Sequence, residues 1–119
     1  MELGSGHGSI AEWLCATVGP SGNVTAIDIN PVLLELIPAQ NLTVERMDVR
    51  TGGLRANAYD LVSCRALLHQ ISDYAPAVLA RMAAALKPGG WLLVQEPDFH
   101  LAPTTKPDVW AKTWKALIE

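Results

Sequence analysis

Cysteine is scarce in this chain, and its two copies form no pattern that binds metal. Cys15 and Cys64 each lie in an apolar run, without a second cysteine or histidine at the spacing of a zinc site. We therefore expect buried free thiols and no metal. Long apolar runs are also absent: no stretch reaches the roughly 18 residues of a membrane span, and no basic segment precedes a hydrophobic one at the start. We expect no membrane partner and a cytoplasmic location.

Charge is sparse, and positive charge is the scarcer kind. Nine Lys and Arg residues against twelve Asp and Glu residues give a formal net charge of −3. Because nucleic-acid backbones are bound mainly through clustered basic side chains, we expect no nucleic-acid partner. Hydrophobic residues make up 50% of the chain and charged residues 18%, which is typical of a folded soluble domain. Residues 1–119 are long enough for a single domain with one core.

Glycine, proline and asparagine divide the sequence into alternating short apolar and longer amphipathic segments. This alternation is typical of a parallel sheet covered by helices. The first predicted helix runs from Ser9 to Val18, with Ser9 and Glu12 forming a capping box at its start. Its buried face is predicted to hold Ile10, Trp13, Leu14, Thr17 and Val18.

The same reasoning divides the rest of the chain. Strands are predicted over Val24–Asp28, Leu42–Met47, Tyr59–Cys64 and Trp91–Glu96, the last of them buried. Helices are predicted over Pro31–Leu36, from Ala75 to a turn at Lys87–Gly90, and over Val109–Ile118 after a loop at Pro97–Lys106.

Three glycines alternate with other residues just before the first predicted helix. A turn containing Gly4, Gly6 and Gly8 would let a ligand approach bare backbone, although such a turn can also be no more than a tight connection. Asp28 lies 20 residues after Gly8, at the end of the next predicted strand. A carboxylate there can accept hydrogen bonds from both hydroxyls of a ribose. The pair therefore indicates a cofactor that contains adenosine.

The spacing of the glycines bears on which adenosine cofactor is bound. The third glycine of the dinucleotide-binding fingerprint would fall at Ser9. If Ser9 caps its own helix, it occupies the helix N-terminus that a pyrophosphate would use. This interpretation disfavours a nicotinamide cofactor but leaves an NAD(P)-dependent oxidoreductase as an alternative.

Five segments occur in the order of a known set of motifs. They are Glu2–Gly8, Ala26–Asp28, Arg46–Val49, Tyr59–Val62 and Leu86–Gly90. Together they resemble the motifs of class I S-adenosylmethionine-dependent methyltransferases, and Leu67–Ile71 is similar to the UbiE-like (type 11) group that acts on small molecules. The resemblance covers roughly residues 1–96. It implies an α/β fold with a doubly wound, mostly parallel sheet and helices on both faces, incomplete because the first strand is mostly missing and the last two strands are absent.

The resemblance implies S-adenosylmethionine as cofactor, S-adenosylhomocysteine as product and a small-molecule methyl acceptor. The glycine-rich loop would pack against the methionine portion, Asp28 would bind the ribose, and Asp48 would contact the adenine amino group. Alternatives remain, with Glu2 as a plain strand acid and Asp48 as an acid that caps a turn. The residues implied to bind the cofactor are Glu2, Gly4, Ser5, Gly6, Gly8, Asp28, Ile29, Met47, Asp48, Val49, Cys64 and Arg65.

His69 is the candidate general base, because an imidazole titrates near neutral pH. A packing role or a place at a helix start is the alternative. His7 is expected to be a solvated loop residue. Residues that could line an acceptor pocket are Tyr74, Phe99 and His100.

Methyl transfer from a sulfonium is an in-line displacement with a neutral thioether as leaving group. Positioning and desolvation can supply much of its rate, so the absence of an obvious catalytic acid does not contradict a methyltransferase. The alternatives are a non-catalytic binding domain of the same fold and, third, the oxidoreductase. A short central first strand would leave backbone groups of its neighbours unpaired. We therefore expect the 119-residue chain alone to be unstable, to self-associate through exposed strand edges, or to be inactive.

Overall fold

The computed structural model describes residues 1–98. The predicted helix at Val109–Ile118, most of the loop before it, and the candidate residues Phe99 and His100 lie outside the described residues. Within residues 1–98 no helix is both long and apolar enough to cross a membrane. The same residues contain no group of three or more His, Cys, Asp or Glu side chains placed to hold a metal ion.

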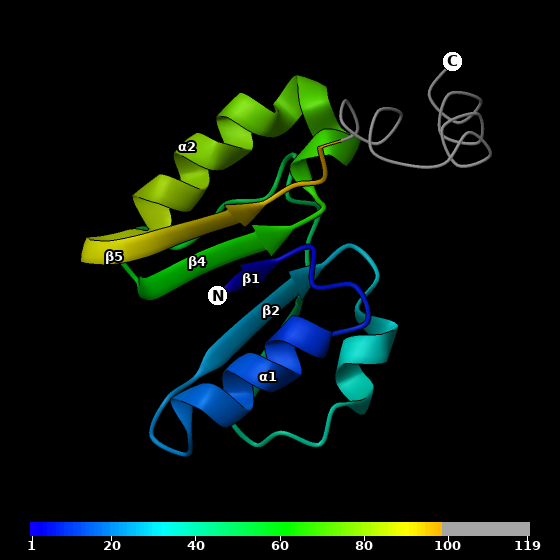
Figure 1. Ribbon diagram of the computed structural model, residues 1–119, viewed down its shortest axis with the longest axis vertical. Coiled ribbons are helices and arrows are strands. Elements are labelled where there is room, and N and C mark those ends of the chain that lie inside the picture. The colour runs from blue at the N-terminus through cyan, green and yellow to red at the C-terminus, as the bar shows by residue number, and fades with distance from the viewer. Residues whose placement is uncertain (99–119) are drawn as a thin grey trace, which may run out of the picture.

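Within residues 1–98, five parallel strands form one sheet in the order β3-β2-β1-β4-β5 (Figure 1). The strands are β1 (Glu2–Leu3), β2 (Val24–Asp28), β3 (Leu42–Arg46), β4 (Tyr59–Arg65) and β5 (Leu86–Gln95). From β1 the chain proceeds outward to β3 and then returns to place β4 on the other side of β1. In such a sheet the connections leaving β1 and β4 diverge and open a crevice at the carboxyl ends of the strands. The predicted doubly wound fold is confirmed.

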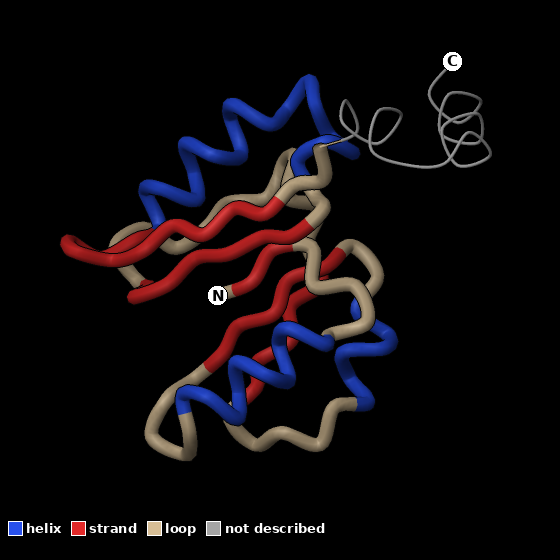
Figure 2. Tube along the Cα trace, in the orientation of Figure 1, coloured by secondary structure: helices blue, strands red, loops and turns tan. Residues whose placement is uncertain are grey.

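Helices cover both faces of this sheet. Helix α1 (Ser9–Val18) and the 3-10 helix η1 (Pro31–Leu36) pack against β2 and β3, whereas α2 (Ala75–Ala85), preceded by η2 (Leu68–Tyr74), packs against β4 and β5 (Figure 2). Ala26 belongs to the core under α1, and its neighbour Ile27 belongs to the core under α2. Since successive strand residues point to opposite faces, the two helical layers lie on opposite sides of the sheet.

Helix α1 has its predicted bounds but only part of its predicted face, namely Leu14 and the partly buried Ile10. Its buried side chains are Ala11, Leu14 and Cys15, whereas Trp13 is 61% exposed. The prediction gave weight to the bulkiest side chains. Close packing of the helix on β2 instead selects small residues, with Ala11 in contact with the cluster around Ala26.

The predicted capping box at the start of α1 is wrong. Gly8 is the N-cap, with a left-handed φ of +83°, and no side chain in the described part of the chain caps the helix. The Gly8 carbonyl accepts the N–H of Glu12 at 2.8 Å, which places Ser9 inside the first turn. A side chain at Gly8 would also collide with Ile37 and Leu34 of the neighbouring segment, at 2.4 and 2.8 Å. Tertiary packing, which the local sequence does not display, therefore fixes this helix start.

Strand β5 begins earlier than predicted and is not buried. It starts at Leu86, directly after α2, and the Lys87–Gly90 segment lies within it opposite an irregular step between Tyr59 and Leu61. Trp91 is 76% exposed. The apolar run suggested a strand covered on both faces, as central parallel strands are. In the described sheet β5 is instead an outer strand, so it has β4 as its single neighbour.

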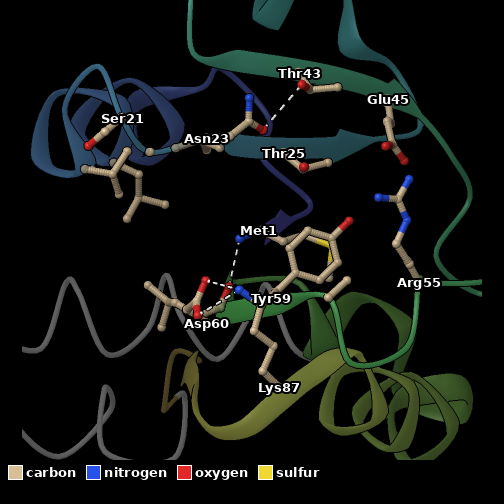
Figure 3. A pocket seen from close by; sticks show the side chains of 16 residues that line it. Met1, Ser21, Asn23, Thr25, Thr43, Glu45, Arg55, Tyr59, Asp60 and Lys87 are labelled. Carbon is tan, nitrogen blue, oxygen red and sulfur yellow. Dashed lines mark hydrogen bonds and ion pairs between the residues drawn. The ribbon is translucent and has the colours of Figure 1, made fainter.

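Strand β1 is very short although it is central. Its two residues pair with Ala26–Ile27 of β2 and Ser63–Cys64 of β4. Ahead of them β2 and β4 border an open cleft of about 530 Å³ next to Met1 (Figure 3). The predicted shortness of the first strand is confirmed, and we refer to this space as the β2–β4 cleft.

Candidate cofactor-binding site

The glycine-rich turn leaves β1 with its backbone in conformations that favour glycine. Gly4 and Gly6 have φ angles of +65° and +52°, and the N–H groups of Gly4 and Ser5 both donate to the carbonyl of Ile27, at 2.8 and 3.1 Å. A Cβ added to Gly6 would meet nothing within 4 Å, so its open side faces space that a ligand can enter. The turn therefore presents bare backbone at the end of β1.

Asp28 connects this turn to the end of β2. One carboxylate oxygen accepts the N–H of Gly6 at 2.8 Å, and the other accepts the N–H of Asn30 at 2.8 Å. These two bonds fix the orientation of the carboxylate. Each carboxylate oxygen has more than one lone pair, so both keep acceptor capacity for a ligand hydroxyl.

Two cavities adjoin each other around the turn. The first, of about 340 Å³, lies beside Asp28, and the second, of about 440 Å³, lies beside Glu2. Both are lined by Gly4, Gly6, Ala66 and Gln70, so they meet between the loops that follow β1 and β4. The first cavity is also lined by Ile29, Met47, Asp48, Val49, Arg50, Leu67 and Ile71, and the second by Ser5, His7, Ser9, Ile10 and Arg65.

Most of the residues implied to bind the cofactor thus line one joined space at the carboxyl ends of the strands. Gly8 and Cys64 line neither cavity. Gly8 faces the side chains of Leu34 and Ile37, and Cys64 is buried in the core, where burial raises the pKa of its thiol to about 11. Neither residue needs a ligand to account for its position. Gly8 is required by close packing against Leu34 and Ile37, and the Cys64 thiol belongs to the hydrophobic core.

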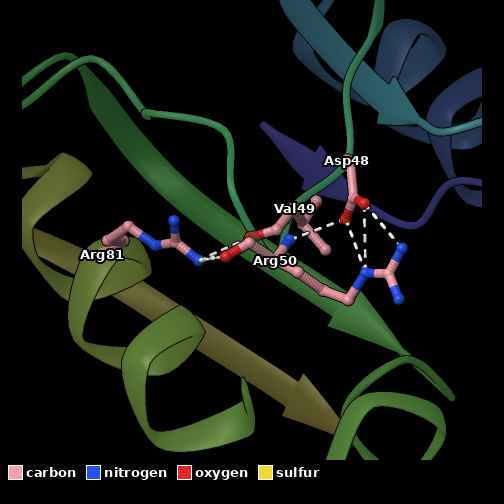
Figure 4. Close-up of polar contacts among 4 residues, drawn as sticks. All are labelled: Asp48, Val49, Arg50 and Arg81. Carbon is pink, nitrogen blue, oxygen red and sulfur yellow. Dashed lines mark hydrogen bonds and ion pairs between the residues drawn. The ribbon is translucent and has the colours of Figure 1, made fainter.

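Asp48 forms a tight ion pair with Arg50 (Figure 4). The guanidinium donates to both carboxylate oxygens, at 2.7 to 3.1 Å, and the Arg50 N–H donates to one of them at 2.9 Å. The hydrogen bonds from Arg50 lower the pKa of Asp48 from 3.8 to about 2. Asp48 is therefore an ionised acceptor at the edge of the first cavity. The Arg50 guanidinium also lies 5.9 Å from the ring centre of Tyr74.

Arg81 holds the loop that carries Asp48 and Val49. From α2 its guanidinium donates to the backbone carbonyls of Val49 at 2.5 Å and Arg50 at 3.1 Å (Figure 4). It also donates to the carbonyl of Gly52 at 2.9 Å. Such loop carbonyls would otherwise need water or another donor. The loop that contributes Asp48, Val49 and Arg50 to the first cavity is therefore anchored to α2.

Glu2 is a buried acid at the floor of the second cavity. It is 3% exposed, and its Oε2 atom has no hydrogen-bond partner among the described residues. Burial raises the pKa of Glu2, while Ser5 and the positive charge of Arg65 oppose that shift. Arg65 lies on the wall of the same cavity, with a guanidinium nitrogen 3.5 Å from the Ser9 hydroxyl. The second cavity thus combines a buried acid, one of whose oxygens lacks a hydrogen-bond partner among the described residues, with a nearby cation.

A family profile described as a methyltransferase domain matches residues 1–118. The chain belongs to the methyltransferase domain family. This confirms the family predicted from the five motifs. The argument from Ser9 against an oxidoreductase fails, because Gly8 and not Ser9 caps α1. The family match now supplies the reason to prefer a methyltransferase.

Similar proteins agree with this family. The methyltransferase domain is 33% identical over 112 residues to the ubiquinone/menaquinone biosynthesis C-methyltransferase UbiE of Francisella philomiragia, covering 87% of this chain and 44% of that protein. Among solved structures, an S-adenosylmethionine-dependent methyltransferase from Mesorhizobium loti is 26% identical with a TM-score of 0.70, covering 86% of this chain and 48% of that one. The phosphoethanolamine N-methyltransferase 1 of Haemonchus contortus, in complex with phosphoethanolamine and S-adenosylhomocysteine, shares the fold at 19% identity and TM-score 0.70, covering 80% of this chain and 21% of that one. The chain spans less than half the length of each of these proteins.

Glu96, which was not predicted from the sequence, holds the backbone at the start of η2, next to the two cavities of the methyltransferase domain. It follows β5, and its carboxylate accepts the backbone N–H groups of Leu67, Leu68 and His69, at 3.0, 2.8 and 3.3 Å. It also lies 2.6 Å from Nδ1 of His69. Burial alone would raise its pKa, but the His69 ring and the three N–H groups outweigh burial and lower it.

The candidate base His69 is therefore held by a carboxylate, at the start of η2. Its side chain lines neither cavity, whereas His7 lines the second. A signal for Glu96 was present in the sequence, because an acid at the carboxyl end of a parallel strand lies at the same edge as Asp28. The partners of Glu96, 27 to 29 residues away, could not be read from it.

Proposed function

We propose that this domain binds S-adenosylmethionine across the two joined cavities and directs its methyl group to a small-molecule acceptor. The bond between the Gly6 N–H and Asp28 is the observation that supports this most directly. It fixes an acid suited to a ribose where the two cavities meet, beside a turn of bare backbone. Residues 1–119 would form one partial S-adenosylmethionine-binding domain.

The amino-acid portion of the cofactor fits the second cavity. That portion carries an ammonium and a carboxylate. Glu2 offers a buried carboxylate oxygen that lacks a partner, which an ammonium would satisfy. Arg65, on the same wall, supplies the cation that a carboxylate requires. The charges of the cavity are thus complementary to those of the methionine portion.

The adenosine portion fits the first cavity. Asp28 would accept the ribose hydroxyls, and Ile29, Met47 and Val49 supply apolar surface for the ring. Asp48 stays ionised because of Arg50, so it can accept a hydrogen bond from the adenine amino group. Arg81 would preserve this arrangement by anchoring the loop that carries Asp48 and Val49.

When bound, the cofactor supplies a methyl group on a positively charged sulfur that leaves as a neutral thioether. The chain's own contribution is to hold that group and an acceptor in line, because alignment and exclusion of water provide much of the rate. Where the acceptor arrives protonated, His69 is the candidate base, with Glu96 fixing its Nδ1; because the ring lines neither cavity, it would act on an acceptor bound outside them. We expect this activity in the cytoplasm, where the two free thiols of Cys15 and Cys64 stay reduced.

Calorimetric titration of the chain with S-adenosylhomocysteine tests the proposal. Asp28→Asn should weaken binding by about 10-fold to 100-fold, because a charged acceptor is lost. Asp60→Asn is the matched control: it also neutralises an acid of the sheet, but one that pairs with Lys87 away from both cavities. Equal affinities of the two variants, or tighter binding of NAD than of S-adenosylhomocysteine by a folded chain, would contradict the proposal.

A further inference from the structure

The place where the two cofactor cavities meet is bordered by a small set of residues. Those that line both cavities are Gly4, Gly6, Ala66 and Gln70. With adenosine in the first cavity and the amino-acid portion in the second, the sulfur that links them would lie at this junction. The two glycines have no side chain, and alanine has only a methyl group. Among the described residues, Gln70 alone therefore brings a polar side chain to both cavities.

The charged side chains of the site line one cavity or the other, but not both. Asp28, Asp48 and Arg50 line the first cavity, and Glu2 and Arg65 line the second. These positions suit the ribose, the adenine and the amino-acid portion, which the methylated and the demethylated cofactor have in common. A contact that distinguishes the two forms of the cofactor should therefore come from the junction.

The side-chain amide of Gln70 is held by a hydrogen bond. Its Nε2 atom donates to the backbone carbonyl of Ala66, four residues earlier in the chain. Because a carbonyl oxygen needs a donor, this bond assigns the nitrogen end of the amide to Ala66. The other end is the oxygen Oε1, which has two lone pairs. Gln70 is exposed and lines both cavities, so this oxygen is available to a group bound at the junction.

Ala66 connects this amide to the end of the sheet. Its N–H donates to the carbonyl of Gln95 in β5 at 2.8 Å, and its own carbonyl accepts the bond from Gln70. Its φ is +52°, a left-handed conformation that alanine rarely adopts. Among the non-glycine residues of 1–98 only Asn57 shares a positive φ, and asparagine tolerates it. Backbone strain of this kind clusters at ligand sites, where surrounding contacts maintain it.

The two forms of the cofactor differ in the charge of their sulfur. In S-adenosylmethionine the sulfur is positive and polarises the C–H bonds of the methyl and methylene groups attached to it. In S-adenosylhomocysteine the sulfur is a neutral thioether. A carbonyl oxygen beside the sulfonium gains charge–dipole attraction and C–H···O contacts, and a thioether offers neither to the same degree. An oxygen at the junction would therefore favour the methylated form.

We propose that Gln70 borders the sulfonium and that its Oε1 atom makes the site prefer S-adenosylmethionine to S-adenosylhomocysteine. This inference rests on the proposed function, because it places the cofactor across the two cavities. Gln70 is then a specificity-determining residue, and Ala66 positions its amide. When the methyl group is transferred, the positive charge is lost and the contact with Oε1 weakens. The affinity for the product falls as a result, which favours its release.

Calorimetric titration of the full chain with S-adenosylmethionine and, separately, with S-adenosylhomocysteine tests this assignment. The measured quantity is the ratio of the two dissociation constants. Gln70→Met has a similar length but no oxygen, so the preference for S-adenosylmethionine should fall by at least about threefold. Gln70→Glu places a charged oxygen at the same position, so the preference should rise instead. Both variants lose the Nε2 donor to Ala66, so a difference between them does not come from that loss.

Gln40→Met is the control, because Gln40 borders a different cavity beside Cys15, and its ratio should equal that of the unchanged chain. A ratio that stays constant in both Gln70 variants would overturn the proposal, since Gln70 would then make no contact with the sulfonium. A ratio that moves in the same direction in both would also overturn it, since the effect would come from the lost bond to Ala66. Failure of the folded, unchanged chain to bind S-adenosylhomocysteine would contradict the proposed function itself, and this assignment with it.

Discussion

Arg50 binds both carboxylate oxygens of Asp48, and the pair lies at the rim of the first cavity. The hydrogen bonds from Arg50 hold the pKa of Asp48 at about 2. A folded-state pKa below the unfolded one contributes stability that is present above the unfolded value and is lost as pH falls through the folded value. The Asp48 contribution should therefore persist above pH 3.8 and vanish as the pH approaches about 2.

Replacing Arg50 should free Asp48 to titrate normally. We expect Arg50→Met to raise the pKa of Asp48 from about 2 toward 3.8, as measured by carbon-detected NMR of the carboxyl group. Arg46→Met is the control, because it removes a similarly exposed cation at the end of β3. It should leave the pKa of Asp48 unchanged. An Asp48 titration that is the same in all three proteins would show that the ion pair does not exist in solution.

Gly19 is the control position for testing the glycine-rich turn at Gly6. Both have a left-handed φ, +52° and +69°, and a Cβ added to either would meet nothing within 4 Å. Alanine should therefore destabilise the fold at both positions, and more at Gly19, whose ψ of −171° combines with that φ in a region that glycine alone commonly adopts. Only Gly6 lines the cofactor cavities, so Gly6→Ala should weaken S-adenosylhomocysteine binding at least about tenfold while Gly19→Ala does not. Equal affinities would place the ligand elsewhere.

Arg65 should recognise the carboxylate of the cofactor. Arg65→Gln should weaken S-adenosylhomocysteine binding about tenfold, through loss of a charged hydrogen bond. Methylthioadenosine lacks the amino-acid portion, so its affinity should not change in the variant. Fluorescence or calorimetric titration of both ligands gives the comparison. A parallel loss for both ligands would mean that Arg65 supports the shape of the site, and unchanged binding of both would remove it from the site.

Glu96 should stabilise the fold in a pH-dependent way. Its pKa is lowered, so its contribution is present above 4.5 and declines as pH falls through the folded value. At neutral pH Glu96→Gln should lower the free energy of unfolding by about 1–2 kcal/mol, because three backbone N–H groups lose an ionised acceptor. His69→Gln should cost less, since it removes only the ring contact. Denaturant titrations across acid pH check both, and a Glu96→Gln deficit that persists after acidification would refute the assignment.

The sequence predicted the elements whose signals are local. Ser9–Val18 was bounded by glycines, and Val24–Asp28 was a run of β-branched residues ending in an acid. Asp28 could be assigned to the site because the ends of parallel strands converge at one edge of the sheet. The bounds of α1 and β2 and one side of the candidate site therefore followed from local signals and spacing.

The features that escaped prediction depend on contacts between distant segments. Arg81 reaches the Val49 carbonyl across 32 residues, and Glu96 reaches Leu67 across 29. Trp13 was predicted to be buried but is exposed. The distance between α1 and the sheet decides which face of the helix is covered, and the small residues of α1 set that distance. The exposure of Trp91 follows from the outer position of β5, which strand propensity cannot reveal.

The measurement that tests the central claim most directly is an NMR titration of the ¹⁵N-labelled chain with S-adenosylhomocysteine. Saturable shifts should appear at the amides of Gly4, Gly6 and Val49, which line the joined cavities, and Gly22, which lines the β2–β4 cleft, should not move. A folded chain that shows no shifts, or shifts centred on Gly22, would contradict a cofactor site at the carboxyl ends of the strands.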